Sequence, residues 1–142
     1  MKPKFGTLEK KLSVIKKNNL LRNLQDSQIE KQFIKQNGKK LLNFSSNDYL
    51  GMNPGKIKHI QFQSSSRLVS GNDNSFSILE KKLAKHKSQE KSIIFPTGYM
   101  ANLGIISSIA DKQDTIFSDE LNHASIVEAC KLSGSKIKIF KH

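Results

Sequence analysis

The sequence contains very little cysteine: Cys130 is the single one among 142 residues. One thiol cannot form an intrachain disulfide, and it cannot build a thiolate metal cluster. The histidines are equally sparse and lie far apart along the chain (His59, His86, His123 and His142). We therefore expect no metal site. The G-x-G-x-x-G and P-loop signatures of nucleotide-binding proteins are absent as well.

Long apolar runs are also missing. No stretch reaches the length that a membrane-spanning helix requires, and the first residues, MKPKFGTLEKKL, lack the apolar segment of a signal peptide. Together with the single cysteine, these features lead us to expect a cytoplasmic protein without a membrane partner.

Negative charge is scarce, with 12 Asp and Glu residues against 24 Lys and Arg, which gives a net charge of +12. Such an excess can indicate an anionic partner such as nucleic acid. However, the two arginines are Arg22 and Arg67, the lysines scatter along the whole chain, and no aromatic residues alternate with them. This distribution argues against nucleic acid, although a small basic, non-enzymatic protein that binds an anionic partner remains the alternative interpretation.

The strongest pattern is an alternation in the last third of the chain. Short β-branched or aromatic runs at residues 92–95, 115–118 and 136–140 are separated by two apolar-periodic segments of helical length. This pattern predicts an α/β fold with a βαβαβ order and a mainly parallel sheet. Ligands of such sheets bind at the carboxyl ends of the strands, which draws attention to residues 96–99 and 119–123.

Each of these two junctions has a structural and a functional interpretation. Thr97 and Gly98 can begin a helix, and the free N–H groups of a helix start favour an anion. Asn122 is a good N-cap for the next helix and would place His123 in its first turn. A plain cap and a surface histidine explain the same residues, so the pattern by itself leaves both interpretations open.

The first half of the chain carries weaker signals. Apolar residues at helical spacing predict an amphipathic helix capped by Thr7 and extending, with a slip, to Leu24. The turn signal of residues 36–39 precedes a predicted short strand at 40–44. Two polar loops, 43–51 and 63–72, are followed by a helix that we expect to begin near Asn74 or Ser75.

Four sequence blocks resemble one known family. They are NFSSNDYLG (43–51), RLVSGN (67–72), TGYMAN (97–102) and DELNHAS (119–125). In this order they resemble the α-oxoamine synthases, fold-type I pyridoxal-phosphate enzymes that join an amino acid to an acyl thioester with loss of carbon dioxide. The first block is most similar to that of the 8-amino-7-oxononanoate synthases, the biotin-pathway branch. The resemblance extends from about Arg22 to the end of the chain.

This resemblance implies a cofactor, pyridoxal 5'-phosphate, and roles for individual residues. Gly98 and Tyr99 match the phosphate-binding turn, and His123 matches the histidine that stacks on the pyridine ring. Asn47 matches an active-site loop and Arg22 a position near the acyl substrate, so both are expected to bind substrate. The implied partners are the amino acid, the acyl thioester, and a second copy in a homodimer or a complementing C-terminal chain.

The sequence also departs from the family. Serines occupy positions 64–66, where glycines are usual, and Phe76 stands where a histidine is common. No lysine stands in the family's Ser/Thr-x-x-Lys-Ala context. We therefore expect an N-terminal fragment without catalytic residues, inactive alone and binding cofactor only with a C-terminal portion. It would comprise a helical arm and first strand (1–42) and a substrate loop with the beginning of the large domain (43–142).

Overall fold

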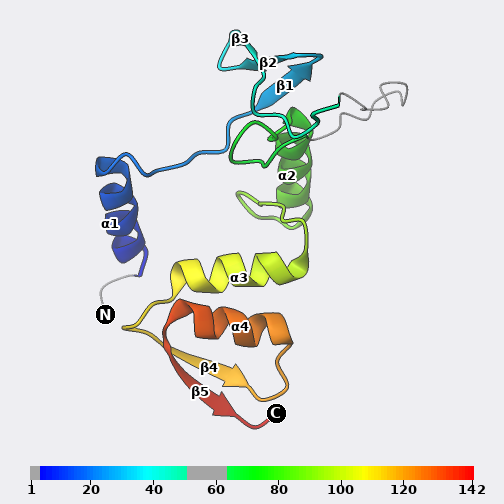
Figure 1. Ribbon diagram of the computed structural model, residues 1–142. Coiled ribbons are helices and arrows are strands. Elements are labelled where there is room, and N and C mark those ends of the chain that lie inside the picture. The colour runs from blue at the N-terminus through cyan, green and yellow to red at the C-terminus, as the bar shows by residue number, and fades with distance from the viewer. Residues whose placement is uncertain (1–3, 51–63) are drawn as a thin grey trace. The chain divides into compact units, whose positions relative to one another are not determined.

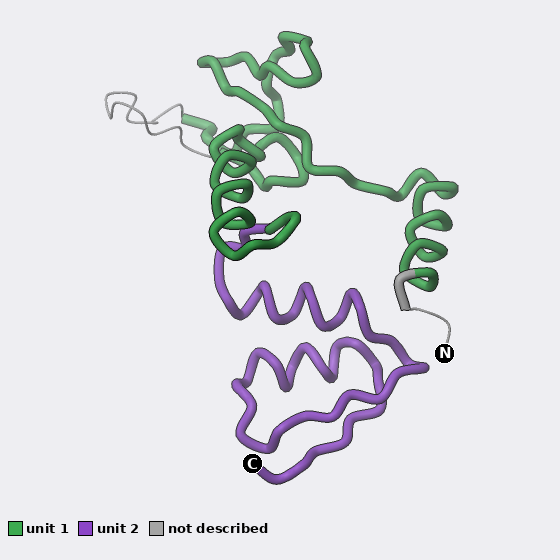
Figure 2. The backbone as a smooth tube through the Cα atoms, turned by 180° about the vertical axis from the view of Figure 1, so that it is seen from behind, with its two compact units in different colours: residues 1–92 green, residues 93–142 purple. Residues whose placement is uncertain are grey.

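The computed structural model describes residues 4–50 and 64–142 (Figure 1). The chain divides into two compact units, Met1–Ser92 and Ile93–His142 (Figure 2). The expected domains, 1–42 and 43–142, refer to a longer enzyme and stay a prediction. Among the described residues, none of the helices has the length and apolar content of a membrane span.

The unit Ile93–His142 is the α/β part of the protein. Its elements are α3 (Gly98–Ile109), β4 (Thr115–Asp119), α4 (Ala124–Ser133) and β5 (Lys136–Phe140). β4 and β5 pair in parallel, from Thr115 opposite Lys136 to Asp119 opposite Phe140. Parallel neighbours need a crossover connection, and α4 provides it. The predicted α/β class, both helices and these two strands are confirmed.

The expected strand at residues 92–95 is wrong, because the described sheets contain no strand there. An apolar run becomes a strand only when its backbone enters a ladder of hydrogen bonds. Residues 93–95 supply β-branched and aromatic side chains, but this segment does not join the β4–β5 ladder, and Pro96 follows at once.

The two helices of this unit run side by side, and their N-termini lie at the same end (Figures 1 and 2). Small side chains on α4 allow the close packing: Ala129 is 0% exposed and Cys130 2%. Gly134 ends α4 in the left-handed conformation, with φ of 72°. A glycine adopts this conformation without steric cost, so the chain can turn directly into β5.

The unit Met1–Ser92 contains a small antiparallel sheet and two helices. Its elements are α1 (Lys4–Lys17), β1 (Ser27–Glu30), β2 (Phe33–Gln36), β3 (Lys39–Leu42) and α2 (Asn74–His86). The sheet order is β1-β2-β3. Asn37 and Gly38 have φ of 51° and 72°, the geometry of a two-residue hairpin turn, which confirms the predicted turn. The expected strand at 40–44 is found at 39–42.

Two further expectations for this unit need correction, and one is confirmed. α1 begins before Thr7, so Thr7 lies inside the helix and does not cap it. The helix does not continue to Leu24, because Asn19 adopts a left-handed φ of 57° that a helix cannot contain. α2 begins at Asn74 as predicted, where the Asp73 carboxylate accepts the N–H of Ser75 at 2.8 Å.

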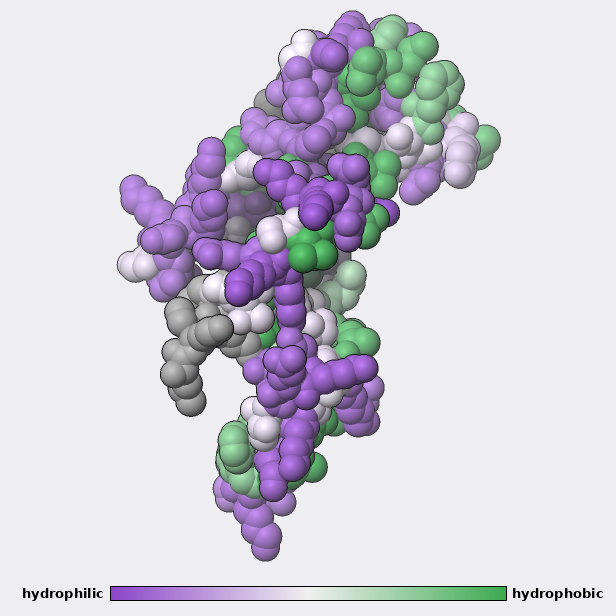
Figure 3. Space-filling model, turned by 90° about the vertical axis from the view of Figure 1, so that its left-hand side faces the viewer, coloured by the Kyte–Doolittle hydropathy of each residue, from purple (hydrophilic) through white to green (hydrophobic). Residues whose placement is uncertain are grey.

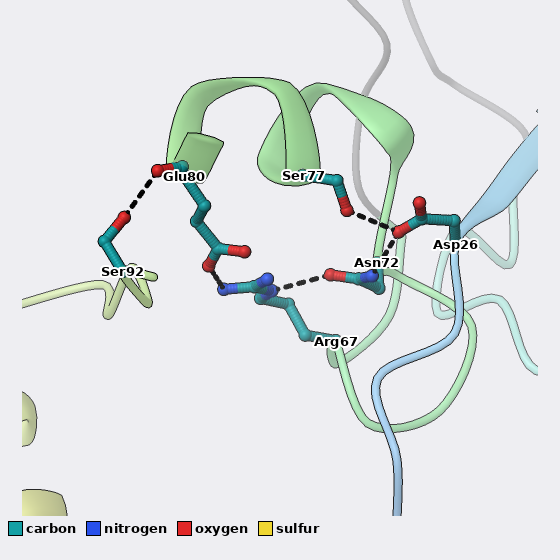
Figure 4. Close-up of polar contacts among 6 residues, drawn as sticks. All are labelled: Asp26, Arg67, Asn72, Ser77, Glu80 and Ser92. Atoms are coloured by element: carbon teal, nitrogen blue, oxygen red, sulfur yellow. Dashed lines mark hydrogen bonds and ion pairs between the residues drawn. The ribbon is translucent and has the colours of Figure 1, made fainter. Parts of the chain in front are cut away.

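A chain of hydrogen bonds, here called the polar anchor, ties the start of β1 to the 64–73 loop and to α2 (Figure 4). Arg67 donates from Nε to Asn72 Oδ1 and from Nη1 to Glu80 Oε1, both at 2.9 Å. Asn72, only 2% exposed, donates to Asp26 Oδ1 at 2.9 Å. Buried polar groups must be paired in this way, so the RLVSGN block acts here as a structural joint. The polar anchor comprises Asp26, Arg67, Asn72, Ser77 and Glu80.

Many large apolar side chains lie at the surface, where they interrupt the hydrophilic areas (Figure 3). On the β4–β5 sheet, Phe117 and Ile139 are each 73% exposed. In contrast, the buried hydrophobic residues among those described are few and mostly small: Ile34, Ala84, Ala110, Ala129 and Cys130.

Candidate cofactor site

The start of α3 presents unused N–H groups. Thr97 caps the helix from an extended backbone: its hydroxyl accepts the N–H of Met100, and its carbonyl accepts that of Ala101, both at 3.1 Å. Among the described residues, no hydrogen bond is found for the N–H groups of Gly98 and Tyr99. These two donors belong to the first turn of α3, at the positive end of the helix dipole.

The surroundings of these donors suit an anion. A Cβ added to Gly98 would meet no atom within 4 Å, so the space beside the backbone is open. The first turn of α3 contains no acidic side chain that would repel a negative ligand. A phosphate group fits this arrangement, because its oxygens accept hydrogen bonds and its charge complements the helix start.

The start of α4 is formed by His123, which is itself the N-cap. Its Nδ1 accepts the backbone N–H of Ser125 at 3.1 Å, as an aspartate oxygen would. The prediction that Asn122 caps α4 is wrong. Its N–H reaches the carbonyl of Asp119 at 3.3 Å and its amide donates to Ser118 Oγ at 3.0 Å, which places Asn122 in the preceding turn. The His123 residue is exposed.

A hydrogen-bond relay connects the second turn of α3 to the start of α4. Ser125 is 0% exposed, and its Oγ lies 2.7 Å from His123 Nδ1. Asn102, on the second turn of α3, donates from Nδ2 to the same Oγ at 2.8 Å. Sequence reasoning gave neither Asn102 nor Ser125 a role. Their presence in the TGYMAN and DELNHAS blocks was the signal that could have pointed to them.

The two predicted substrate residues lie in the unit Met1–Ser92. Arg22 is exposed between α1 and β1, and Asn47 is exposed in the loop after β3. Gly51, which ends the NFSSNDYLG block, and His59 lie outside the described residues. Gly98, Tyr99 and His123 share one unit and one end of it. Cofactor contact by these three residues, and substrate contact by Arg22 and Asn47, stay predictions.

Comparison with known proteins establishes the family. Residues 39–142 match the family model described as aminotransferase class I and II. The chain belongs to this family. It is 39% identical over 145 residues to the putative 8-amino-7-oxononanoate synthase of Methanococcus aeolicus, covering 95% of this chain and 36% of the relative. It is 40% identical over 144 residues to the 8-amino-7-oxononanoate synthase of Lysinibacillus sphaericus, covering 94% of this chain and 37% of the relative.

Solved structures agree with this assignment. The serine palmitoyltransferase of Sphingomonas wittichii is similar with a TM-score of 0.56 and 26% identity, covering 96% of this chain and 37% of that one. A serine palmitoyltransferase from S. paucimobilis with bound PLP–myriocin aldimine gives a TM-score of 0.56 and 25% identity. The match covers 98% of this chain and 38% of that one. The fold is that of the fold-type I enzymes, and the predicted resemblance to 8-amino-7-oxononanoate synthases is confirmed. The chain spans a little over a third of the length of these relatives.

Proposed function

We propose that this chain supplies the phosphate-binding and ring-stacking part of a pyridoxal-phosphate site. The proposed enzyme joins an amino acid to an acyl thioester with loss of carbon dioxide, as an 8-amino-7-oxononanoate synthase of biotin synthesis. The observation that supports this most is the arrangement at one end of the unit Ile93–His142. There the open N–H pair of Gly98 and Tyr99 lies on one helix and His123 begins the helix beside it.

Each residue has a defined task in this proposal. Gly98 and Tyr99 donate their backbone N–H groups to the phosphate, and the open space at Gly98 lets the phosphate approach the backbone. The exposed imidazole of His123 holds the pyridine ring flat by stacking. The cofactor, when bound, supplies the electron sink for carbon–carbon bond chemistry. Arg22 and Asn47 are proposed to contact the acyl and amino-acid substrates.

We further propose that residues 1–142 bind the cofactor firmly only together with the part of the enzyme that corresponds to the rest of the relatives. No lysine here stands in the Ser/Thr-x-x-Lys-Ala context that would hold the cofactor covalently. The chain by itself is therefore expected to be inactive. The complete site is proposed to form in a cytoplasmic homodimer or with a complementing chain.

A fusion protein tests the proposal. Residues 1–142 replace the matching part of the Lysinibacillus sphaericus enzyme, and the purified fusion is assayed for cofactor absorbance and for condensation of alanine with an acyl thioester. We expect both, together with growth of a biotin auxotroph that lacks this synthase. A fusion that folds but shows no cofactor absorbance would overturn the proposal. Turnover with serine or glycine but not alanine would keep the cofactor site and change the substrate.

One observation favours the alternative of an anionic partner. The unit Met1–Ser92 holds 19 of the 24 Lys and Arg residues and 7 of the 12 acidic ones, whereas Ile93–His142 holds five of each. The net charge of +12 therefore belongs entirely to the first unit. If this charge served nucleic acid, binding of a duplex would weaken steeply with salt and would be insensitive to Gly98 and His123. Nucleic-acid binding that survives physiological salt would support this alternative.

A further inference from the structure

We infer that Asn102 and Ser125 are positioning residues that fix the tautomer and the orientation of the His123 ring. The inference rests on the proposed function for its purpose, because a ring that stacks on a cofactor must be held in one orientation. Its evidence is independent of any cofactor. It lies in the hydrogen bonds at the start of α4 and in the one that joins Ser125 to α3.

The direction of these hydrogen bonds follows from the donors. The backbone N–H of Ser125 can only donate, so His123 Nδ1, 3.1 Å away, is the acceptor and carries no proton. With Nδ1 unprotonated, the Ser125 hydroxyl, 2.7 Å from the same nitrogen, is also a donor, and the two donors share the single lone pair of Nδ1. Its oxygen keeps lone pairs, and Asn102 Nδ2 donates to it at 2.8 Å. The relay therefore runs from Asn102 through Ser125 to His123.

This direction determines where the ring carries its proton. With Nδ1 used as an acceptor, the neutral imidazole bears its hydrogen on Nε2, the ring nitrogen away from Ser125. The exposed part of the ring is thus a donor. Since Ser125 is fully buried, water does not compete for its hydroxyl. The ring is held by two hydrogen bonds, one from a backbone amide and one from a hydroxyl that is itself fixed by α3.

Two substitutions remove the relay in different ways. Ser125→Ala deletes the hydroxyl and leaves the backbone N–H as the remaining donor to Nδ1. Asn102→Asp keeps the size of the side chain but replaces a donor with a carboxylate that only accepts. The Ser125 hydroxyl would then donate to Asp at position 102 instead of to His123. Ser107→Ala is the matched control, because Ser107 is a half-buried serine of α3 whose Oγ bonds the carbonyl of Leu103 at 2.6 Å.

The test is the ¹⁵N spectrum of the histidine-labelled chain, recorded at a pH at which the imidazole is neutral. A His123→Asn variant identifies the His123 signals. In the unmodified chain and in Ser107→Ala, we expect Nδ1 to be unprotonated and Nε2 protonated. In Ser125→Ala and Asn102→Asp the two nitrogen signals should move toward each other, as both tautomers become populated. Circular dichroism verifies that the helices persist in each variant.

Two results would overturn the inference. The first is a protonated Nδ1 or an even tautomer mixture in the unmodified chain. This measurement does not depend on the folding of any variant. The second is an unchanged spectrum in both relay variants. In the fusion protein, the inference also expects several-fold weaker cofactor affinity for Asn102→Asp and none of this loss for Ser107→Ala. A correct tautomer without any cofactor binding would refute the proposed function alone, whereas normal cofactor binding with mixed tautomers would refute this inference alone.

Discussion

The guanidinium of Arg67 lies over the ring of Phe76, with Arg67 Cζ 4.1 Å from the ring centroid. This contact completes the polar anchor, in which the same guanidinium bonds Asn72 and Glu80. The side chains of Arg67 and Glu80 are each 15% exposed, so solvent screens the cation little. The ring face of Phe76 therefore binds a cation that is largely shielded from solvent.

We predict that Phe76→Leu lowers the free energy of unfolding by roughly 1–2 kcal/mol, because leucine keeps an apolar side chain but loses the cation–π attraction. Phe76→Tyr retains the ring face and should lower the free energy of unfolding much less. Urea unfolding of both variants measures the difference. Equal losses in the two variants would contradict this prediction, because tyrosine keeps the ring face and leucine does not.

Gly71 should tolerate no side chain. A Cβ placed there would lie 1.9 Å from the carbonyl oxygen of Ser65, which is backbone and cannot rotate away. We predict that Gly71→Ala destabilises the unit Met1–Ser92 by more than about 3 kcal/mol, since the 64–73 loop must be rebuilt. Gly6→Ala is the control: its Cβ meets nothing, and alanine gains up to about 1 kcal/mol in a helix such as α1. A stable Gly71→Ala protein would contradict this packing.

The proposed phosphate site gives a graded prediction for the fusion protein. Gly98→Asp should nearly abolish cofactor absorbance, because it puts a carboxylate beside the N–H pair. Gly98→Ala should weaken binding less, since an added Cβ has room in the free chain. His123→Ala should also retain part of the absorbance, because the phosphate site is intact and the ring is loosened. Equal cofactor binding by the unmodified protein and Gly98→Asp would refute the placement of the phosphate.

The sheet of the unit Met1–Ser92 provides a prediction on pH. The hydrogen bond from Lys35 holds the pKa of Glu30 below its ordinary value, and the charges of Lys35 and Lys40 act in the same direction. A folded-state pKa below the unfolded one stabilises the fold above the ordinary glutamate range, and this contribution is lost as pH falls through the lowered pKa. We predict that Lys35→Met raises the pKa of Glu30 toward its ordinary value. A ¹³C titration of the carboxyl group measures it, and an unchanged pKa would contradict the Lys35 contact.

The parts of the fold that sequence could predict are those with local causes. The periodic apolar residues of α3 and α4, the start of α2 near Asn74 and the Asn37–Gly38 turn each depend on neighbours within a few positions. β1 and β2 were missed because residues 29–34 show little alternation. Their pairing depends on partners across the sheet: the buried Ile34 stands opposite Ile29 of β1 and Leu41 of β3.

The same distinction explains the candidate site. Gly98, Tyr99 and His123 could be proposed from their sequence blocks. However, Asn102 and Ser125 meet across two helices, and no rule of spacing predicts a contact between residues 23 positions apart. The N-cap was misplaced by one residue because asparagine is the better cap by propensity. In the turn after β4, the side-chain amide of Asn122 donates to Ser118, and His123 takes the capping position.

The joint between Ser27 and the 64–73 loop also has a consequence for the order of folding. Ser27 is buried by residues that are synthesised much later. Its hydroxyl donates to the carbonyl of Ser70 at 2.7 Å, 43 positions further along the chain, and its N–H donates to the carbonyl of Asn72 at 2.9 Å. The hairpins of β1, β2 and β3 can form as soon as they emerge, but the outer edge of β1 waits for Asn72 and Asp73. A nascent chain that pauses in this interval presents an open strand edge to its neighbours. We therefore expect slow translation between β3 and α2 to favour aggregation of this protein.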